Sequence, residues 1–453
     1  MGALHWLAAT LAHAAAGIGA VLAYVLLTRA HGERRPPASA VAWVLSLALL
    51  PWVALPLYLL FGRRKALRLA APAPVAPVHG LPWAARMARA FGIPGPHAAQ
   101  LRFDADGPQA LDSVLALIDG ARERLDIEVF ILGGRHDPVA ARCVDAMAAA
   151  AARGVRVRLL LDALASRAVD LRALRARGIQ ARFFRPIFGR SDGTPRNLRN
   201  HRKLAVADGE RLWSGGRNLA REYFQDAPGA PAWLDLSFRV DGALAHDAAR
   251  LFEHDWADAP GHPFAGADRA LAPPPEAGAQ WLPSGPDMPE DCAHAVLVDA
   301  CYRAADAIVA VTPYFVPDDA LLQALRLAAV RGVRIDLVLP AVSNHRLADI
   351  ARARALRDLA AAGARIHLLP RMVHAKAFVL DDALALCGST NLDPRSLLLN
   401  HELSVMCFAP GDIAWLRAWM QARIGECARY VPDRPGMLRD LGEGLVRSVA
   451  FQL

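Results

Sequence analysis

The stretch that decides the fold occurs twice in this sequence. Residues 201–208 read His-Arg-Lys-Leu-Ala-Val-Ala-Asp, and residues 374–381 read His-Ala-Lys-Ala-Phe-Val-Leu-Asp. In both copies Lys follows His by 2 residues, Asp follows Lys by 5, Gly follows Asp by 7 and Asn follows Gly by 3. A single His-x-Lys pair on a strand usually decorates a surface. Two copies at identical spacing indicate a duplicated functional site.

The spacing within each copy has a physical meaning. Side chains two residues apart on a β-strand share a face, so His201 and Lys203 are expected to project together, as are His374 and Lys376. The Gly that follows lets the backbone approach a ligand closely. The side-chain amides of Asn218 and Asn391 can donate to an oxyanion.

The sequence around the two copies also repeats. Residues 153–161 (RGVRVRLLL) are echoed by residues 331–339 (RGVRIDLVL). Each follows a helical pattern and a strand-like run, which predicts α/β architecture with helices covering mixed sheets. We expect two similar halves over residues 78–270 and 290–453, related by a pseudo-twofold axis. The Pro-rich stretch 272–289 is expected to be a linker.

Two such halves would supply two imidazoles, two ammonium groups and two amides around one pocket. This set suits displacement at phosphorus. One His attacks, the other protonates the leaving oxygen, and Lys and Asn hold the non-bridging oxygens. The chain has six Cys but no CxxC pair, and neither a metal site nor a cofactor is predicted.

The first 70 residues differ from the rest. Residues 3–28 and 38–61 carry no formally charged side chain, and each run is long enough to meet the roughly 20 residues that a spanning helix needs. They predict a transmembrane helical hairpin over residues 1–70, with Pro51 and Pro56 kinking the second helix. The alternatives are a re-entrant hairpin, a buried hairpin of a soluble core, and a cleaved signal peptide, which is disfavoured because no basic stretch precedes the first apolar run and a second run follows at once.

The charge of the chain gives information on its binding partners and on its orientation in the membrane. The 453-residue chain has a formal net charge of +8, which is compatible with an anionic partner such as nucleic acid or acidic lipid. A basic cluster follows the second apolar run: Arg63, Arg64, Lys65 and Arg68. The positive-inside rule then predicts a multi-pass protein of the inner (cytoplasmic) membrane with both halves in the cytoplasm.

Both motifs resemble the HxKxxxxD signature of the phospholipase D superfamily, and the surrounding sequence is similar to that of bacterial cardiolipin synthases. The similar segments include residues 200–203, 215–218, 312–317, 388–396 and 400–402, with Tyr223 and the apolar hairpin. Residues 133–137 and 370–373 depart from the family pattern. The second departure lies next to the expected pocket and bears on acceptor preference.

The resemblance implies a metal-independent phosphatidyl transfer between two phosphatidylglycerol molecules, which gives cardiolipin and glycerol. By motif position His201 would be the nucleophile and His374 the general acid and then base, although the reverse assignment is open. Lys203 and Lys376 would hold phosphate, with Asn218 and Asn391 assisting.

The two motif aspartates lie farther from the motif histidines along the sequence than the lysines do. The motif includes Asp208 and Asp381 in the catalytic set, yet each lies five residues beyond its Lys, or about 15 Å along a strand, too far to touch the histidine. They could instead pin the motif strands. Asp235 and Glu402 are the candidates to orient the imidazoles.

Three other functions compete with the transferase. A hydrolytic phospholipase D would use the same residues with water as acceptor and release phosphatidic acid. A membrane-tethered phosphodiesterase or nuclease fits the basic charge, but it has no need of a membrane hairpin, so nucleic acid is not the expected partner. A non-catalytic scaffold does not account for two complete ionic sets.

Overall fold

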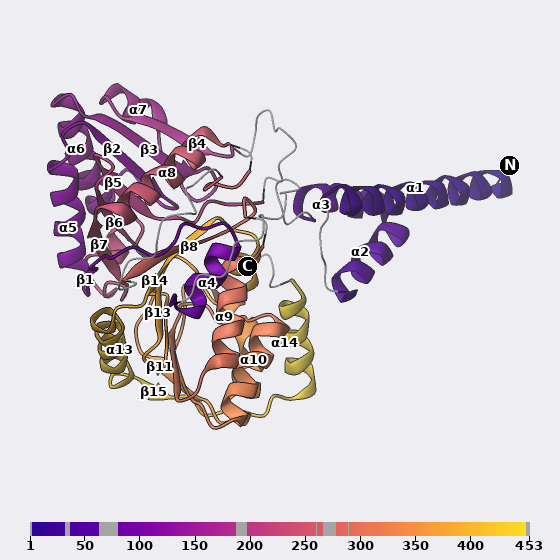
Figure 1. The fold of residues 1–453 in the computed structure, drawn as a ribbon. Helices are drawn as coiled ribbons and strands as arrows, with labels where there is room; N and C mark the ends of the chain where they lie inside the picture. Colours follow the sequence, from indigo (N-terminus) through magenta and orange to yellow (C-terminus); the bar gives the residue numbers. More distant parts are fainter. Residues whose placement is uncertain are drawn as a thin grey trace.

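The computed structural model describes residues 2–31, 37–62, 80–186, 197–259, 261–265, 278–288 and 290–449. It shows three helices at the N-terminus and a large body of two α/β halves (Figure 1). The basic cluster at residues 63–68 lies outside the described residues.

The first half contains a 7-stranded sheet in the order β1-β7-β6-β5-β2-β3-β4. Strands β2, β3 and β4 are parallel, and the others run antiparallel to their neighbours. The strands are β1 (Arg102–Asp104), β2 (Arg124–Val129), β3 (Arg156–Asp162), β4 (Gln180–Phe184), β5 (Leu204–Ala207), β6 (Arg211–Gly215) and β7 (Ser237–Asp241). Its helices are α5 (Gly107–Asp119), α6 (Pro138–Ala152), α7 (Leu171–Ala176), η1 (Arg221–Tyr223) and α8 (Ala243–Ala257).

The second half repeats this topology. Its sheet runs β8-β14-β13-β12-β9-β10-β11 in the same order, with β15 added at the far edge. The strands are β8 (Ala279–Ser284), β9 (Ala307–Val311), β10 (Arg334–Pro340), β11 (Arg365–Leu369), β12 (Ala377–Leu380), β13 (Leu384–Gly388), β14 (Glu402–Cys407) and β15 (Ala428–Arg429). The helices are α4 (Trp83–Ala90), which packs on α9, α9 (Cys292–Arg303), α10 (Asp319–Val330), α11 (Arg346–Ala361), α12 (Pro394–Leu398), α13 (Pro410–Ile424) and α14 (Met437–Val449).

The expectation of two similar α/β halves is confirmed by this topology. The linker expected over residues 272–289 is wrong for Ala279–Ser284, because this segment forms β8 and pairs with β14 along its whole length. Strand β8 takes the place that β1 has in the first half. Pro283 does not prevent strand formation because β8 lies at the edge of the sheet.

A shared core joins the halves. One hydrophobic cluster contains apolar side chains from both sheets and from α8 and α13, among them Leu204, Phe238, Trp281, Val379 and Val405. Two further clusters lie on the outer faces, one under α5 and α6 and the other under α9, α10 and α11. The motif strands β5 and β12 are buried along their whole length, which fixes the positions from which the motif side chains project.

The N-terminal region departs from a simple hairpin. Helix α1 (Gly2–His31) is long and apolar enough to cross a membrane over His5–Ala30. The expected second span is broken at Leu50 into α2 (Pro37–Leu49) and α3 (Pro51–Phe61). Each is too short to cross the roughly 30 Å hydrocarbon core at 1.5 Å per residue. The prediction of two full spans is therefore corrected to one long helix and two short ones among the described residues.

The break has the cause that the sequence indicated. Pro51 has no N–H, so it begins a new helix at its first position instead of continuing α2. The two short helices still pack on α1, where Tyr24 and Trp43 make edge contacts with Tyr58 at 5.1 and 5.2 Å between ring centroids. The region therefore forms a small cluster of its own.

The motif aspartates hold the strands in place. The Asp208 carboxylate accepts hydrogen bonds from the backbone N–H groups of Arg122, Glu123 and Arg124 at 2.8–3.2 Å. Asp381 does the same for residues 305–307 at 2.7–2.9 Å. The catalytic assignment that the motif suggests for Asp208 and Asp381 is replaced by a structural one: each ties its motif strand to the start of the central parallel strand.

Electrostatics and backbone geometry agree with this role. Burial raises the pKa of Asp208, but the amides of Glu123, Arg124 and Arg122 outweigh it and hold the pKa below its usual value. Asp208 and Asp381 have positive φ angles of 58° and 44°. Asp and Asn tolerate this left-handed conformation better than other residues with a Cβ.

We predict that Asp208→Ala lowers the free energy of unfolding by about 1–3 kcal/mol, because three backbone donors lose their acceptor. Asp208→Asn keeps one acceptor oxygen and the tolerated conformation, and should lose less. Urea unfolding of both variants measures the difference. Activity per folded molecule should stay close to that of the unsubstituted protein. A stable but inactive Asp208→Ala protein would restore the catalytic assignment.

Candidate active site

Two short backbone bridges bring the halves together at the motif histidines. Asn200 pairs with His401, and Leu234 pairs with Val373, each in parallel orientation. The His201 N–H donates to the His401 carbonyl at 2.8 Å, and the His374 N–H donates to the Leu234 carbonyl at 2.6 Å. The bridges are related by the pseudo-twofold arrangement. Each one places a motif histidine of one half beside a carboxylate of the other half.

The two histidine–carboxylate pairs therefore cross between the halves. His201 Nδ1 lies 2.9 Å from Glu402 Oε2, and His374 Nδ1 lies 2.7 Å from Asp235 Oδ2. The structure thus brings Asp235 and Glu402 to the imidazoles, as the sequence hypothesis expected, with partners exchanged between the halves. A carboxylate at Nδ1 fixes the tautomer with hydrogen on Nδ1 and leaves the Nε2 lone pair for chemistry.

Burial governs the charge of both histidines. It lowers the pKa of His201 to about 4, against the opposing effect of Glu402. It lowers the pKa of His374 to about 3, helped by the charge of Lys376 and opposed by Asp235. Both imidazoles are therefore neutral near pH 7 in the empty site, as a nucleophile must be.

The carboxylates remain ionised despite complete burial. Burial alone would raise the pKa of Glu402, but the neighbouring His201 and Lys203 and hydrogen bonds from His201 and Ser389 hold it below its usual value. The pKa of Asp235 is also lowered, because His374, Lys376 and Arg217 outweigh the effect of burial. Each half thus keeps one buried negative charge behind the other half's imidazole.

The motif lysines point to the same place. Lys203 Nζ donates to the His201 carbonyl at 2.7 Å, and Lys376 Nζ lies 3.0 Å from His374 Nε2. Burial lowers the pKa of Lys203 to about 7 and that of Lys376 to about 8. An anion beside these two lysines, such as a phosphodiester, would raise their pKa values and keep them charged.

Aromatic side chains surround the two motif histidines. The Phe130 ring contacts the His201 ring at 4.8 Å, and Tyr223 and Trp233 lie 5.0 and 5.7 Å from the His374 ring. Phe130 and Trp233 were not predicted as site residues, because an aromatic residue in an apolar run gives no separate signal. These rings help to exclude water, which strengthens the electrostatic interactions between the site and a bound phosphate.

The segments that contain Gly215 and Gly388 lie against the two buried carboxylates. A Cβ at Gly216 would lie 2.2 Å from Asp235 Oδ1, so only glycine fits there. The equivalent residue of the second half is Ser389, whose hydroxyl donates a short hydrogen bond to Glu402. The close approach expected at these segments is thus to a buried carboxylate of the protein itself.

The side-chain amides of Asn218 and Asn391 already form hydrogen bonds within the protein. Asn218 Oδ1 accepts from the Ile131 N–H at 3.0 Å, and Asn218 Nδ2 donates to the Tyr223 hydroxyl at 2.8 Å. Asn391 Nδ2 donates to the Ser396 hydroxyl at 3.1 Å. These contacts orient both side chains. The predicted role of Asn218 and Asn391 in substrate binding stays a prediction.

One cluster next to the site has ligand types that a metal could use. Atoms of His254, Asp255 and Asp287 lie within 4.8 Å of one another. The guanidinium of Arg202 already fills this cluster, donating to Asp255 at 2.6 Å and to Asp287 at 2.8 Å with no exposed surface. The cluster is a buried ion network between the halves, and Arg202 takes the place that a cation would need.

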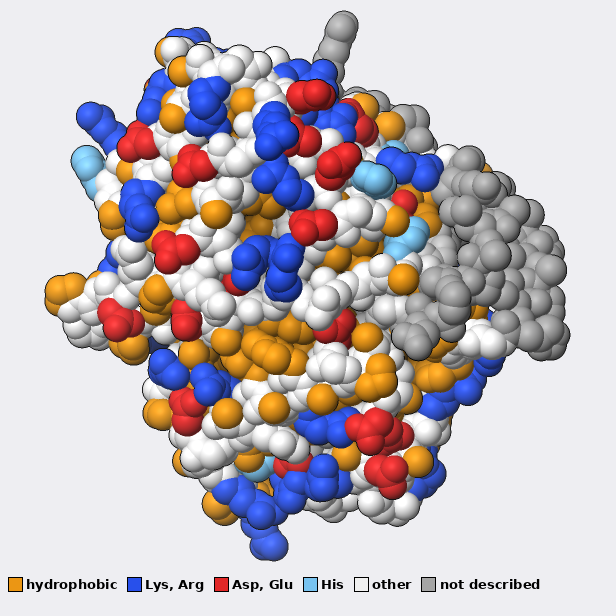
Figure 2. All heavy atoms as spheres, turned by 60° about the vertical axis from the view of Figure 1, so that its left-hand side comes forward, with side chains coloured by type: hydrophobic (Ala, Val, Ile, Leu, Met, Phe, Trp, Pro, Cys, Tyr) orange, Lys and Arg blue, Asp and Glu red, His pale blue; other side chains and the backbone are white. Residues whose placement is uncertain are grey.

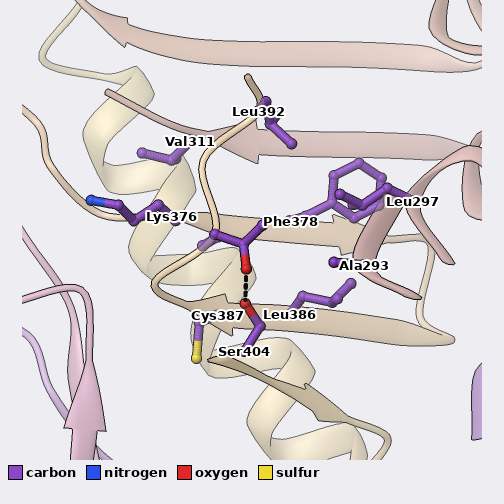
Figure 3. A pocket seen from close by; sticks show the side chains of 11 residues that line it. Ala293, Leu297, Val311, Lys376, Phe378, Leu386, Cys387, Leu392 and Ser404 are labelled. Carbon is purple, nitrogen blue, oxygen red and sulfur yellow. Dashed lines mark hydrogen bonds between the residues drawn. The ribbon is translucent and has the colours of Figure 1, made fainter. Parts of the chain in front are cut away.

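A small cavity lies behind the second motif strand (Figure 3). Its lining is apolar except for Lys376 and for Thr390 and Ser404, whose hydroxyls are 2.9 Å apart. The Lys376 ammonium points away from the apolar residues Ala293 and Leu297 (Figure 3). The cavity is therefore a space under the sheet, and the Lys376 ammonium lies away from its apolar residues.

The sequence matches the family described as "Cardiolipin synthase, PLD-like domain" over residues 114–256 and 297–424. Cardiolipin synthase A of Klebsiella pneumoniae (strain 342) is 31% identical, with 92% of this chain and 93% of that protein covered. The chain belongs to the bacterial cardiolipin synthase family. Cardiolipin synthase A of Pseudomonas aeruginosa (strain LESB58) is 29% identical over 95% of this chain and 94% of that protein.

This membership identifies the chain as a phosphatidyltransferase of the phospholipase D superfamily with phospholipid substrates. Residues 18–63 match the family described as "Phospholipase D-nuclease N-terminal", so the apolar region is part of what the family shares. Together with α1, this match supports association with a membrane.

Solved structures agree on the fold. The phosphatidylserine synthase of Haemophilus influenzae Rd KW20 superposes with a TM-score of 0.61 at 15% identity, covering 82% of this chain and all of that one. The polyphosphate kinase of Porphyromonas gingivalis gives a TM-score of 0.50 at 14% identity, covering 83% of this chain and 58% of that one. The two-half architecture is thus shared by distant proteins.

We predict that Asp235→Asn lowers kcat by about 10²–10⁴-fold, because an amide cannot hold the His374 tautomer as a carboxylate does. The measurement is phospholipid turnover by the folded variant. Asp104→Asn is the matched control, since Asp104 is also fully buried but binds Ser113 at 2.9 Å, away from both histidines. Equal losses in the two variants, or full activity of Asp235→Asn, would contradict the orienting role.

The lysine pKa values predict an alkaline limit on activity. Lys203 and Lys376 lose their charge as the pH rises through about 7 and 8. We expect kcat/KM, which reports the free enzyme, to begin to fall near pH 7 and to fall further above pH 8, while the histidines stay neutral throughout. A profile from pH 5 to 10 on vesicles of constant composition tests this. A flat profile up to pH 10 would contradict it.

Proposed function

We propose that this protein makes cardiolipin and glycerol from two molecules of phosphatidylglycerol, through a phosphatidyl-histidine intermediate. The observation that carries the proposal is the crossed pair of neutral imidazoles, each with a carboxylate at Nδ1, beside two buried lysines. This set contains a nucleophile, a proton carrier and cations for phosphate.

In the first step His201 Nε2 forms a bond to the phosphorus of one phosphatidylglycerol. The bond from phosphorus to the glycerol headgroup oxygen breaks, and His374 gives that oxygen a proton. His374 must first be protonated, although burial lowers its pKa to about 3. The negative phosphodiester raises that pKa on binding, so His374 takes up a proton from solvent together with the substrate, and Lys376 keeps its charge.

In the second step the terminal hydroxyl of another phosphatidylglycerol attacks the phosphorus. His374 takes the proton from this hydroxyl, and the bond between phosphorus and His201 breaks. Lys203 and Lys376 hold the non-bridging oxygens in both steps. The two copies of the motif are so similar that exchange of the roles of His201 and His374 is the alternative assignment.

The hydrolytic alternative needs only water as acceptor, and the rings of Phe130, Tyr223 and Trp233 around the histidines argue against free access of water. A nuclease needs a continuous basic surface. Figure 2 shows Lys and Arg interspersed with Asp and Glu on one face of the molecule, with apolar side chains between them. On the described part of this face no basic stripe forms, which favours a lipid substrate.

The membrane orientation is also a proposal. The basic cluster at residues 63–68 follows the apolar helices in the sequence. By the positive-inside rule, this cluster and the two halves after it lie in the cytoplasm, where the anionic leaflet attracts basic residues. A multi-pass topology would need α2 and α3 to cross together, whereas a re-entrant arrangement fits their lengths.

The experiment is incubation of proteoliposomes with labelled phosphatidylglycerol, without added metal, followed by analysis of the lipid products. We expect cardiolipin and glycerol in equal amounts, and we expect both to disappear with His201→Ala. Rapid denaturation in detergent at mildly alkaline pH during turnover should leave label on His201, because the phosphoramidate bond that forms there is stable at that pH and labile only in acid. Phosphatidic acid as the main product would point to hydrolysis, and label on His374 would reverse the two roles.

A further inference from the structure

The C-terminal helix α14 (Met437–Val449) is attached to the body by only one face. Its Glu443 is 5% exposed and binds Arg357 at 2.5 Å. Val446 packs against Val316 and Ala351. Arg447 reaches Asp319 at the start of α10, 2.6 Å away. These contacts fix which side of the helix faces outward.

The outward face is apolar. Met437 and Leu438 are 84% and 82% exposed, and Leu441 and Leu445 are each 71% exposed. Met437, Leu441 and Leu445 follow one another at intervals of four residues and Leu438 is adjacent to Met437, which places all four on consecutive turns of one side. Val431, just before the helix, is 79% exposed. A contiguous apolar stripe of this kind marks an interaction surface, in contrast to single exposed apolar residues.

The position of α14 indicates what covers this stripe. Figure 1 shows α14 on the side of the body from which α1–α3 project, with its axis running across the direction of α1. If α1 crosses the bilayer, a helix in this position lies parallel to the membrane plane. Asp440, Glu443 and Arg439 lie on the side turned away from the stripe, where they make ion pairs with Arg357, with Asp433 or with one another. The exposed basic residue Arg434 precedes the helix. An apolar stripe on a helix whose charged side chains face the other way matches a helix in the interface of a phospholipid bilayer.

We propose that α14 is a second membrane contact, with Met437, Leu438, Leu441 and Leu445 inserted among the acyl chains of an anionic phospholipid bilayer. This contact would hold the catalytic halves against the surface that contains the substrate. It would act together with α1, which is long enough to cross the bilayer. Only this consequence for turnover rests on the proposed function.

The direct test uses the full chain in vesicles of phosphatidylglycerol and phosphatidylethanolamine. Leu441→Cys is labelled with an environment-sensitive fluorophore, and the parent protein gives the background from the native cysteines, of which only Cys427 is not buried. We expect blue-shifted emission that is quenched by lipids brominated on their acyl chains. Ala149→Cys, on the exposed side of α6, is the control and should stay unquenched.

A kinetic test separates docking from chemistry. Leu441→Glu with Leu445→Glu keeps good helix formers at exposed positions, so the fold is unaffected. We expect turnover of phosphatidylglycerol in vesicles to fall by about tenfold or more. Turnover of a short-chain analogue dissolved as monomers should be unchanged, and Leu441→Met should behave like the parent protein.

The outcomes are distinguishable. An unquenched label at residue 441 overturns the proposal, and so does a label that reports a second copy by self-quenching. Equal loss on vesicle and monomeric substrate also overturns it, because the substitutions would then act on the site. A quenched label on a protein that makes no cardiolipin would leave the membrane contact standing and remove the proposed function.

Discussion

The site depends on the two backbone bridges between the halves, Asn200 with His401 and Leu234 with Val373. Each bridge places a histidine of one half against a carboxylate of the other, so neither half contains a complete catalytic pair. A displacement of one half by a single ångström would separate both pairs at once. The shared core and the buried Arg202 network, which touches Asp255 and Asp287, hold the halves in this register.

Burial shifts the pKa values of the basic and acidic groups in the pocket in opposite directions, and neighbouring charges determine the net shift. It lowers the pKa values of the histidines and lysines, and it would raise those of Asp235 and Glu402 if no cations stood near them. The result is neutral imidazoles, ionised carboxylates and lysines close to deprotonation. Such strongly shifted pKa values in one buried cluster are typical of functional sites.

The N-terminal helices and α14 concern contact with the membrane, whereas the two α/β halves form the candidate active site. Helix α1 is long enough to cross a bilayer, and the exposed apolar stripe of α14 lies on the same side of the body. The short helices α2 and α3 add packing around Tyr58, where Tyr24 and Trp43 meet its ring.

The sequence by itself determined the duplicated α/β halves and the motif residues, because strand periodicity and identical spacing are local properties. It also favoured structural roles for Asp208 and Asp381, since five residues of strand are too long for contact with the histidines. Only the tertiary structure decided that the carboxylate partners cross between halves, because this depends on how two sheets pack. The same holds for β8 within the expected linker, where pairing with β14 outweighs the local effect of proline. It also holds for the second apolar run, since a proline indicates a break but only packing on α1 fixes where the two short helices lie.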